Sequence, residues 1–335
     1  MASEPRSPAR RLLLALGCLL ALVGTATLLV GAFPDWQRTS RLAALGAPFV
    51  PYGALVWLAA GAIVVTAARR WWKLLAILAA GGMAVHLVWA APYLTGRGQS
   101  AASPSAESLT AESLTVMTIN VRYGTADMAA LVAAVESADP DVVVLVEITT
   151  DSREALRALE WDEMFPNHVG EPAPAWDSSG TMVFSTFPLE LLGTAQSIQQ
   201  QHTIRVEGPA GPLVMMAVHP INPWVDFDHW ATELEDIRVE AEAHTGEPLI
   251  ALGDFNAVRE HLPMRRLLDA GLTEAAEQAG AGWLRTFPAD RVIPPLIAID
   301  HVLVNRHLRV VSVTTFSVAG SDHLGLVASI EPTGS

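Results

Sequence analysis

The stretch PLIALGDFNAV, residues 248–258, is the most informative part of the sequence for the fold. A short apolar run leads to a glycine, and Asp254 and Asn256 then stand two positions apart. An apolar run of this length without alternation is typical of a strand that is buried on both faces. Alternate residues of an extended segment point to the same side. We therefore expect both polar side chains to face one cleft at the end of a buried strand.

Similar apolar runs alternate with helical segments between residues 113 and 335, which predicts an α/β domain. The expected strands lie within residues 113–124, 141–149, 181–189, 202–208, 212–220, 248–257, 297–304 and 324–331. The expected helices lie within residues 127–138, 227–244 and 260–271, and Asp127 is expected to cap the first of them.

Three long apolar runs precede this domain, at about residues 12–33, 42–66 and 72–94. Each exceeds the roughly 20 residues that cross a bilayer, which predicts three transmembrane helices. A cleaved signal peptide is the alternative for the first run, but its apolar stretch is longer than the usual signal core. Cys18, the single cysteine, could suggest a lipid attachment site, yet the large Leu16 does not fit one and a thiol buried in the membrane is expected.

The positions of basic residues predict the orientation in a bacterial cytoplasmic membrane. Arg6, Arg10 and Arg11 precede the first run, and Arg69, Arg70 and Lys73 lie between the second and the third. Because positive loops stay in the cytoplasm, the N-terminus is expected inside. Residues 1–94 would then be the anchor, 95–112 a flexible linker, and 113–335 an extracytoplasmic domain.

The charge of the outer domain disfavours one broad class of partner. Residues 95–335 contain 13 Lys and Arg against 33 Asp and Glu, a net charge of −20. Proteins that grip a phosphate backbone usually present a basic patch, so nucleic acid is an unlikely substrate. A substrate held in the nearby membrane is favoured, and no protein partner can be inferred.

Polar side chains collect where the most apolar strands are expected to end. They are Asn120, Glu147, His219, Asp254, Asn256, Asp300, Asp322 and His323. Any one of them could be a turn cap or a surface residue, but a charge near a buried strand needs a partner or a metal. Carboxylate and amide oxygens suit Mg²⁺, with Mn²⁺ as a second choice, and the ligand set does not suit zinc. A histidine held by an acid and an aspartate near water together predict metal-assisted hydrolysis of a phosphate ester.

Six motifs in order carry a family resemblance: TINVRYG, DPDVVVLVE, AVHP, LGDFNA, IDHVLV and SDHLGL, with RTFP at residues 285–288 as an accompanying element. They resemble the endonuclease/exonuclease/phosphatase superfamily over about residues 113–331. The resemblance implies a four-layer α/β sandwich of two mixed sheets flanked by helices, with an active site along one edge.

The resemblance also implies individual roles. Asn120, Glu147 and Asp322 would lie at the metal, with Glu147 as the principal ligand. Asp254 would orient or activate water, and Asn256 would hold the phosphate. His323 would contact the phosphate with Asp300 as its orienting acid, and His219 would be a second phosphate contact. Arg122, two positions after Asn120, is a further candidate for phosphate binding.

The three-helix anchor and the acidic domain resemble a membrane-anchored bacterial branch that includes the teicoplanin-resistance protein VanJ. This implies hydrolysis of a lipid-linked phosphate or pyrophosphate, such as undecaprenyl pyrophosphate or another cell-wall precursor. A sphingomyelinase-like phosphodiesterase, an extracellular nuclease and a non-enzymatic lipid-binding protein remain the alternatives. His86, in the third apolar run, could serve function or pack neutrally between helices.

Overall fold

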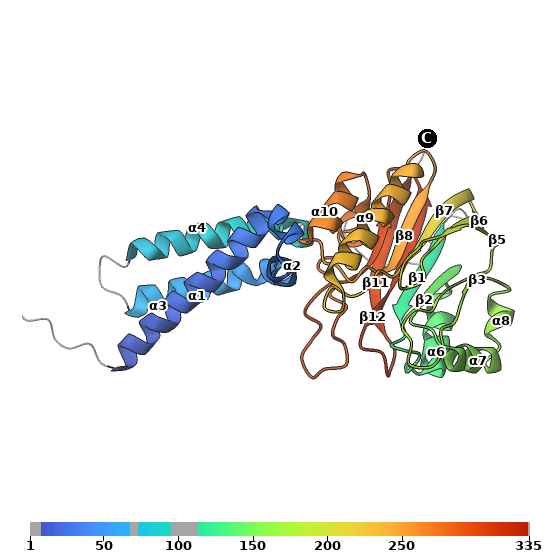
Figure 1. Cartoon of the computed structure of the whole chain (residues 1–335), viewed down its shortest axis with the longest axis horizontal. Coiled ribbons are helices and arrows are strands. Elements are labelled where there is room, and N and C mark those ends of the chain that lie inside the picture. The colour runs from blue at the N-terminus through green and yellow to red at the C-terminus, as the bar shows by residue number, and fades with distance from the viewer. Residues whose placement is uncertain (1–7, 68–72, 95–112, 334–335) are drawn as a thin grey trace, which may run out of the picture. The chain divides into compact units, whose positions relative to one another are not determined.

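The computed structural model describes residues 8–67, 73–94 and 113–333, which form two compact units. The first unit is Met1–Pro92 with the short segment Glu260–Leu262, and the second is Tyr93–Arg259 with Pro263–Ser335. Figure 1 shows a helical unit and a unit built on strands.

The helical unit begins with α1, Pro8–Ala32. The 3-10 helix η1 (Pro34–Arg38), α2 (Arg41–Gly46) and the 3-10 helix η2 (Ala47–Tyr52) follow, and then α3 (Gly53–Ala67), α4 (Lys73–Trp89) and α5 (Ala91–Leu94). Proline at positions 48 and 51 accompanies the 3-10 turn between α2 and α3, since proline lacks the N–H that a continuous α-helix needs.

The prediction of three spans needs correction. In the described residues, two helical stretches are long and apolar enough to cross a membrane, Pro8–Ala32 and Arg41–Thr66. The third predicted span falls partly on α4, which has 17 residues and rises about 26 Å, less than the roughly 30 Å of a hydrocarbon core. The break before α5, next to Pro92, ends this helix early.

Glycines line the inside of the helical unit, and large apolar side chains cover its outside. A Cβ added at Gly24 of α1 or at Gly82 of α4 would lie 2.7 Å or 2.5 Å from the indole of Trp57, which projects from α3. The buried residues of α1 are Gly17, Gly24, Thr27 and Gly31, whereas leucines such as Leu12 and Leu22 are exposed by 73% and 68%. This is the reverse of a water-soluble bundle, and small residues at helix contacts are typical of membrane helices.

His86 of α4 is fully buried in this unit and lies 3.2 Å from the Thr27 hydroxyl of α1. Its ring also packs edge-on against Trp89, at 5.4 Å between centroids. These contacts are those of a histidine packed between helices, which was one of the two interpretations of its sequence position.

The second unit is an α/β sandwich of two mixed six-stranded sheets, which confirms the predicted architecture. The first sheet has the order β11-β12-β1-β2-β4-β3 and the second the order β5-β6-β7-β8-β10-β9. The strands are β1 Leu114–Asn120, β2 Val142–Val146, β3 Asn167–Glu171, β4 Thr181–Ser185, β5 Leu189–Thr194, β6 His202–Gly208, β7 Gly211–Val218, β8 Leu249–Asp254, β9 Thr273–Glu274, β10 Asp300–Val304, β11 Leu308–Ser317 and β12 Leu324–Pro332.

Alternation along the strands divides the core into two layers. Val116, Val144 and Ile250 belong to the cluster between the sheets, while the neighbouring Met117 and Leu145 face the helices outside the first sheet. Burial of both faces explains why these strands read as continuous apolar runs. The strands that end at the candidate site therefore contribute to both layers of the apolar core.

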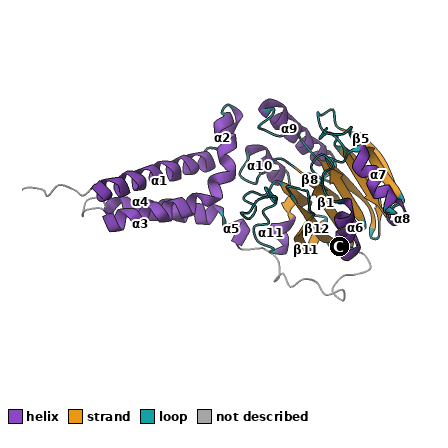
Figure 2. Cartoon of the chain, turned by 90° about the horizontal axis from the view of Figure 1, so that it is seen from below, coloured by secondary structure: helices purple, strands orange, loops and turns teal. Residues whose placement is uncertain are grey.

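Helices cover the outer faces of the sheets (Figure 2). They are α6 Met128–Ala138, α7 Thr150–Ala158, α8 Trp161–Met164, α9 Phe227–Ala243 and α10 Leu262–Asp269. The short helix α11, Ala275–Ala279, instead packs Ala275 and Ala279 into the core between the sheets. The Asp127 carboxylate accepts from the backbone N–H groups of Ala129 and Ala130, which confirms the predicted cap of α6. Asp226 caps α9 in the same way through His229 N–H.

Candidate active site

The ends of strands from both sheets bring the predicted polar residues to one edge of the sandwich. In the first sheet, Asn120 ends β1, Glu147 follows β2, and His323 directly precedes β12. The register pairs β1 with β2 in parallel and with β12 antiparallel, so these three positions lie at the same edge. The site is therefore built on the rigid ends of buried strands.

The second sheet contributes the other half of the site. His219 follows β7, Asp254 ends β8, and Asp300 begins β10. β7 and β8 are parallel, and Asp300 of β10 is the direct antiparallel partner of Asp254. Directly paired residues in an antiparallel ladder lie close together, which explains why two aspartates from distant parts of the chain meet here.

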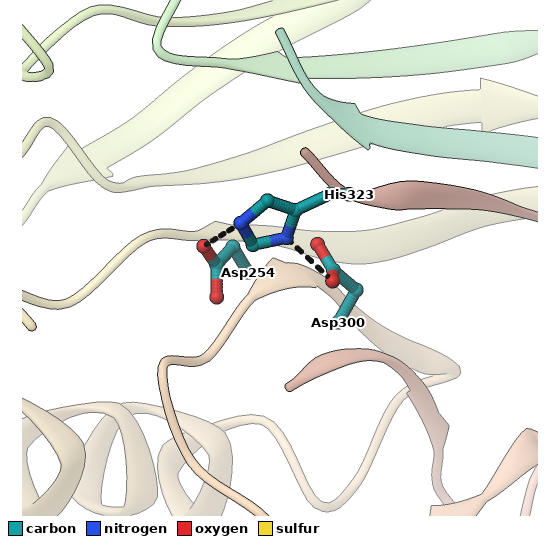
Figure 3. Close-up of side chains that lie close together, drawn as sticks. All are labelled: Asp254, Asp300 and His323. Carbon is teal, nitrogen blue, oxygen red and sulfur yellow. Dashed lines mark hydrogen bonds and ion pairs between the residues drawn. The ribbon is translucent and has the colours of Figure 1, made fainter. Parts of the chain in front are cut away.

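His323 lies between the two aspartates (Figure 3). Its Nδ1 is 2.8 Å from Asp300 Oδ2, and its Nε2 is 3.8 Å from Asp254 Oδ2. All three side chains are buried, and their ligating atoms lie within 4.8 Å of one another. The shorter contact orients the ring, and the longer one exceeds a hydrogen bond, so Nε2 is free to donate to another oxygen.

The two aspartates set the charge of the histidine. Burial by itself would lower the pKa of His323, but the negative charges of Asp300 and Asp254 outweigh it and raise this pKa to about 10. Burial, followed by the charge of Asp300, raises the pKa of Asp254. At neutral pH the site therefore holds a protonated histidine beside a carboxylate that is more basic than usual.

Asn120 connects Glu147 to Asp254. Its amide Nδ2 donates to Glu147 Oε1 at 2.9 Å and to Asp254 Oδ2 at 3.1 Å. The other oxygen of Glu147 accepts from the backbone N–H of Tyr123 at 2.9 Å. Burial raises the pKa of Glu147, and the bonds from Asn120 and Tyr123 oppose this rise. The carboxamide thus fixes the relative positions of two acids.

His219 is almost fully buried, with Nε2 3.9 Å from Glu147 Oε1. Burial lowers its pKa to about 4, although the charge of Asp254 acts in the opposite direction. His219 is therefore neutral where His323 is charged. Two histidines in one site, one neutral and one positively charged, can serve different functions.

Asn256 lies at the site, but its amide group is directed to the loop after β7. Its Nδ2 donates to the carbonyl of Pro220 at 3.0 Å, and its Oδ1 accepts from Asn222 at 3.2 Å. Its backbone N–H donates to Asp254 Oδ1 at 2.8 Å. In this structure Asn256 positions Asp254 and the loop, and phosphate contact by its side chain stays a prediction.

Arg122 and Asp322 lie together at the border of the site. Arg122 Nε is 3.6 Å from Asp322 Oδ2, and its Nη1 is 3.1 Å from Asp290 Oδ2. The Arg122 side chain is 38% exposed. Among the described residues, the ion pair of Asp322 is with Arg122, and its predicted role at a metal stays untested.

The donor set suits a divalent cation. Glu147, Asp254 and Asp300 are three carboxylates in a buried region, and His323 is the protonated residue that faces them. Uncompensated buried negative charge is unfavourable. Carboxylate and amide oxygens are the ligands that Mg²⁺ and Mn²⁺ take in proteins. Among the described residues, Asp254, Asp300 and His323 also bring one possible ligand atom each within 4.8 Å of one another.

Several supporting residues were not predicted from the sequence. Ser321 accepts from the N–H of His323 at 3.0 Å and donates to the carbonyl of Asn120 at 2.7 Å, so it joins the first and last strands at the site. Thr286 Oγ1 accepts from the N–H of Asp300 at 3.3 Å, and Phe287 packs on the His323 ring at 4.9 Å. Thr286 and Phe287 belong to the RTFP element, whose presence was the signal available for them.

Comparison with known proteins supports the family. A model described as "Endonuclease/Exonuclease/phosphatase family" matches residues 117–323, more than half of the chain. A comparison with curated proteins found no match.

Solved structures with the same fold are distant in sequence. An endonuclease/exonuclease/phosphatase from Beutenbergia cavernae is 21% identical with a TM-score of 0.54, and the match covers 67% of this chain and 72% of that one. TDP2 of D. rerio, complexed with a single-stranded DNA product, is 16% identical with a TM-score of 0.54 over 65% of this chain and 99% of that one. An endonuclease/exonuclease/phosphatase from Bacteroides vulgatus is 16% identical with a TM-score of 0.51 over 66% and 99%.

These likenesses support the fold, and the family match spans every candidate residue from Asn120 to His323. The chain belongs to the endonuclease/exonuclease/phosphatase family, whose members are phosphoesterases.

Proposed function

We propose that this protein is a membrane-anchored, divalent-metal-dependent phosphohydrolase that acts on a lipid-linked phosphate or pyrophosphate. The observation that carries the proposal is the coexistence, in one chain, of the Asp300–His323–Asp254 arrangement with a helical unit whose leucines face outward. Undecaprenyl pyrophosphate or a related cell-wall precursor is the favoured substrate, as in the branch that includes VanJ, which would connect the protein to teicoplanin resistance.

The chemistry follows from the described side chains. Asp254, buried and more basic than an ordinary aspartate, orients and deprotonates the attacking water. Protonated His323, held by Asp300, donates from Nε2 to a phosphoryl oxygen. Asn120 keeps Glu147 and Asp254 in fixed relative positions. Glu147 and Asn120 would hold Mg²⁺, which supplies charge neutralisation at the phosphate.

Anchoring is supported by the exposed surface of the helices. In the most apolar 18-residue stretch of Pro8–Ala32, only 17% is buried inside the protein, and in that of Arg41–Thr66 only 28%. The core helix of a soluble protein would bury far more of its apolar side chains. We propose that α4 is too short to cross alone and that the apolar run 73–94, in which α5 follows α4, completes a third crossing, which would place the second unit outside the cytoplasm.

A nuclease is the second candidate, because the similar TDP2 structure contains a DNA product. The arginines of this chain argue against it. Nine of the twelve arginines among residues 113–333 have a carboxylate within 4 Å. Arginines that are already paired release few counterions from a polyanion, so binding to nucleic acid would be weak. Sphingomyelin remains an alternative lipid substrate.

The test is a substrate panel with the full-length protein in detergent, Mg²⁺ being present. We expect release of inorganic phosphate from undecaprenyl pyrophosphate, with little cleavage of sphingomyelin and of single-stranded or duplex DNA. Ready DNA cleavage without phosphate release from the lipid would favour the nuclease.

Two variants connect this activity to the site. Asp254→Asn and His323→Ala should each lower turnover at least about 100-fold, as expected when a positioned acid–base group is lost. Asp269→Asn, at an exposed carboxylate that ends α10, is the matched control and should retain full turnover. Wild-type turnover by both site variants would exclude the mechanism.

A further inference from the structure

Exposed apolar side chains of the second unit are concentrated on one edge. Of the eleven large apolar residues that are exposed between residues 113 and 333, seven lie on loops that leave the catalytic ends of the strands. We call these seven the apolar rim: Tyr123, Trp176, Ile198, Trp224, Val225, Val292 and Ile293. Trp176, Val225 and Val292 are 80%, 74% and 106% exposed.

The opposite edge of the sandwich provides an internal comparison. The turns there are residues 139–141, 186–188, 209–210, 244–248 and 305–307. Within these described turns no large apolar side chain is exposed. Exposed apolar residues scattered singly need no explanation, but their concentration around one functional edge does. The asymmetry indicates a surface that contacts an apolar partner.

Hydrogen bonds connect the loops of the rim. Gln199 Nε2 donates to Ser178 Oγ at 2.8 Å, which joins the Ile198 loop to the Trp176 loop. The Glu233 carboxylate accepts from the N–H groups of Ile198 and Ile221 at 2.9 and 2.7 Å, which adds the Trp224 loop. The rim residues on these three loops thus belong to one connected surface.

Two further interactions connect loops of the rim with one another and with residues of the candidate site. The ion pair between Arg122 and Asp290 joins the Tyr123 loop to the segment that carries Val292 and Ile293. Asn222, in the Trp224 loop, bonds to Asn256 beside Asp254. The loops of the apolar rim are therefore linked to the residues to which the phosphate chemistry is assigned, at the same edge of the sandwich.

The loop tips have the composition of a segment that enters a lipid interface. They read PAPAW at 172–176, INPWV at 221–225 and VIPPLI at 292–297, and none contains a charged residue although the whole domain is strongly acidic. Tryptophan and aliphatic side chains are favoured at a bilayer surface. Proline limits the backbone, so little conformational entropy is lost when the tips become ordered.

We propose that the apolar rim inserts into the surface of the bilayer and so presents the catalytic edge to phosphates at the level of the lipid headgroups. This inference rests on the proposed function, because it takes the bilayer of the anchor as the partner. Tyr123 and the tryptophans could instead stack on bases, but valine and isoleucine offer no such stacking. A lipid surface uses all seven residues.

The length of the chain permits this arrangement. β1 starts at the edge opposite the rim, and its seven residues advance about 23 Å toward the catalytic edge. Eighteen residues, 95–112, join the last apolar helix to Ser113, and a chain of that length reaches at most about 65 Å. This reach exceeds the length of β1, so the chain length allows the catalytic edge to lie at the bilayer although β1 starts at the opposite edge.

The first test measures insertion without any turnover. Full-length protein carrying Cys18→Ser receives one new cysteine, at Val225→Cys or Val292→Cys, labelled with a polarity-sensitive fluorophore and placed in nanodiscs. Val239→Cys on α9 is the matched control, because Val239 is 52% exposed but lies away from the rim. Spin-labelled phosphatidylcholine should quench the two rim positions at least about twofold and leave position 239 unchanged.

Equal quenching at all three positions, or none at the rim, would overturn the proposal. Because this readout does not depend on catalysis, it remains valid even if undecaprenyl pyrophosphate is not the substrate. Failure of the rim and failure of the proposed function are thereby distinguished.

The second test separates surface binding from chemistry. Val225→Asp combined with Val292→Asp should raise KM for undecaprenyl pyrophosphate in nanodiscs about tenfold, since each charge opposes insertion. Turnover of the soluble p-nitrophenyl phosphate, which also carries a terminal phosphate, should not change, and Val239→Asp should behave as wild type. An unchanged KM, or a loss of affinity for single-stranded DNA instead, would contradict insertion into lipid.

Discussion

At the scale of single residues, the site depends on two histidines that the same fold holds in different charge states. His323 faces two aspartates and has a raised pKa, whereas His219 lies deeper and has a lowered one. Their sequence contexts, AVHP and SDHL, do not reveal this difference. It arises because β10 brings Asp300 beside His323, a contact between strands that are distant in the sequence.

The charge state of His323 predicts a pH dependence. Because the pKa is about 10, the imidazolium is retained at neutral pH and is lost as the pH rises through this value. Activity that needs this proton should fall on the basic side. Asp300→Asn removes a charge that raises the pKa, so the basic limb of the activity profile should move to lower pH. A pH profile of residual turnover measures this shift.

Asp269→Asn is the control for that profile, and its basic limb should coincide with that of the wild type. An unchanged basic limb in Asp300→Asn would mean that another group sets it.

The same reasoning applies to stability. The contribution of the charged histidine to the free energy of unfolding is complete below its ordinary pKa of 6.5 and disappears as pH rises through about 10.

Glu147 predicts the metal response. Chelation with EDTA should abolish turnover, and Mg²⁺ or Mn²⁺ should restore it, since buried carboxylates need a cation. Glu147→Gln should raise the Mg²⁺ concentration needed for half activation about tenfold or more, because metal-site changes cost affinity on that scale. Titration of activity with Mg²⁺ gives the measurement. Full turnover in EDTA would contradict a metal-dependent reaction.

At the scale of elements, β7 and β8 approach each other too closely for any side chain at Gly253. Its φ is 141°, and an added Cβ would lie 2.0 Å from the carbonyl oxygen of Val218. Gly253→Ala should lower the free energy of unfolding by at least about 2 kcal/mol. Thermal unfolding of the full chain in detergent measures the loss.

Gly246→Ala is the matched control, because a Cβ there meets nothing within 4 Å. It should unfold at the wild-type temperature. Because Gly253 precedes Asp254, the strained variant should also lose turnover below its unfolding temperature. Equal stability of the two variants would show that the strands can separate at little cost.

The buried strands were predictable and the edge strands were less so. β1, β2, β7 and β8 form continuous apolar runs in the sequence, because both of their faces are covered. β3, whose NHVGE sequence is half exposed, has no such signal. In β11, buried and more exposed residues partly alternate, which is a strand signal. Its threonines and serines are also typical of a loop, and they obscure that signal.

The candidate site was predictable to a similar degree. Residues at the ends of apolar strands were identified, because rigid strands aim them at one edge. Asn222 was not, since it lies on a loop whose position depends on its bond to Asn256. Loop conformation of this kind follows from tertiary contacts and leaves little trace in local sequence.

At the scale of the whole molecule, the number of crossings determines on which side the second unit lies. We predict that an alkaline phosphatase fusion after Ser335 is active, and that one after Arg70 is inactive, since this enzyme matures only outside the cytoplasm. The reason is the cluster of Arg69, Arg70 and Lys73, which should stay inside. Activity in cells measures both. Equal behaviour of the two fusions would mean that α4 does not cross.

The pairing of the first strand with the last has a consequence for biosynthesis. β1 is hydrogen-bonded to β12 from Leu114 with Ile330 onward, and Ser321 and His323 come just before β12. A ribosome must therefore make nearly the whole chain before β1 finds its partner on that side. Chains that stop before residue 321 lack both β12, the neighbour of β1 in the first sheet, and His323, so an unfinished product has neither a complete first sheet nor a complete site.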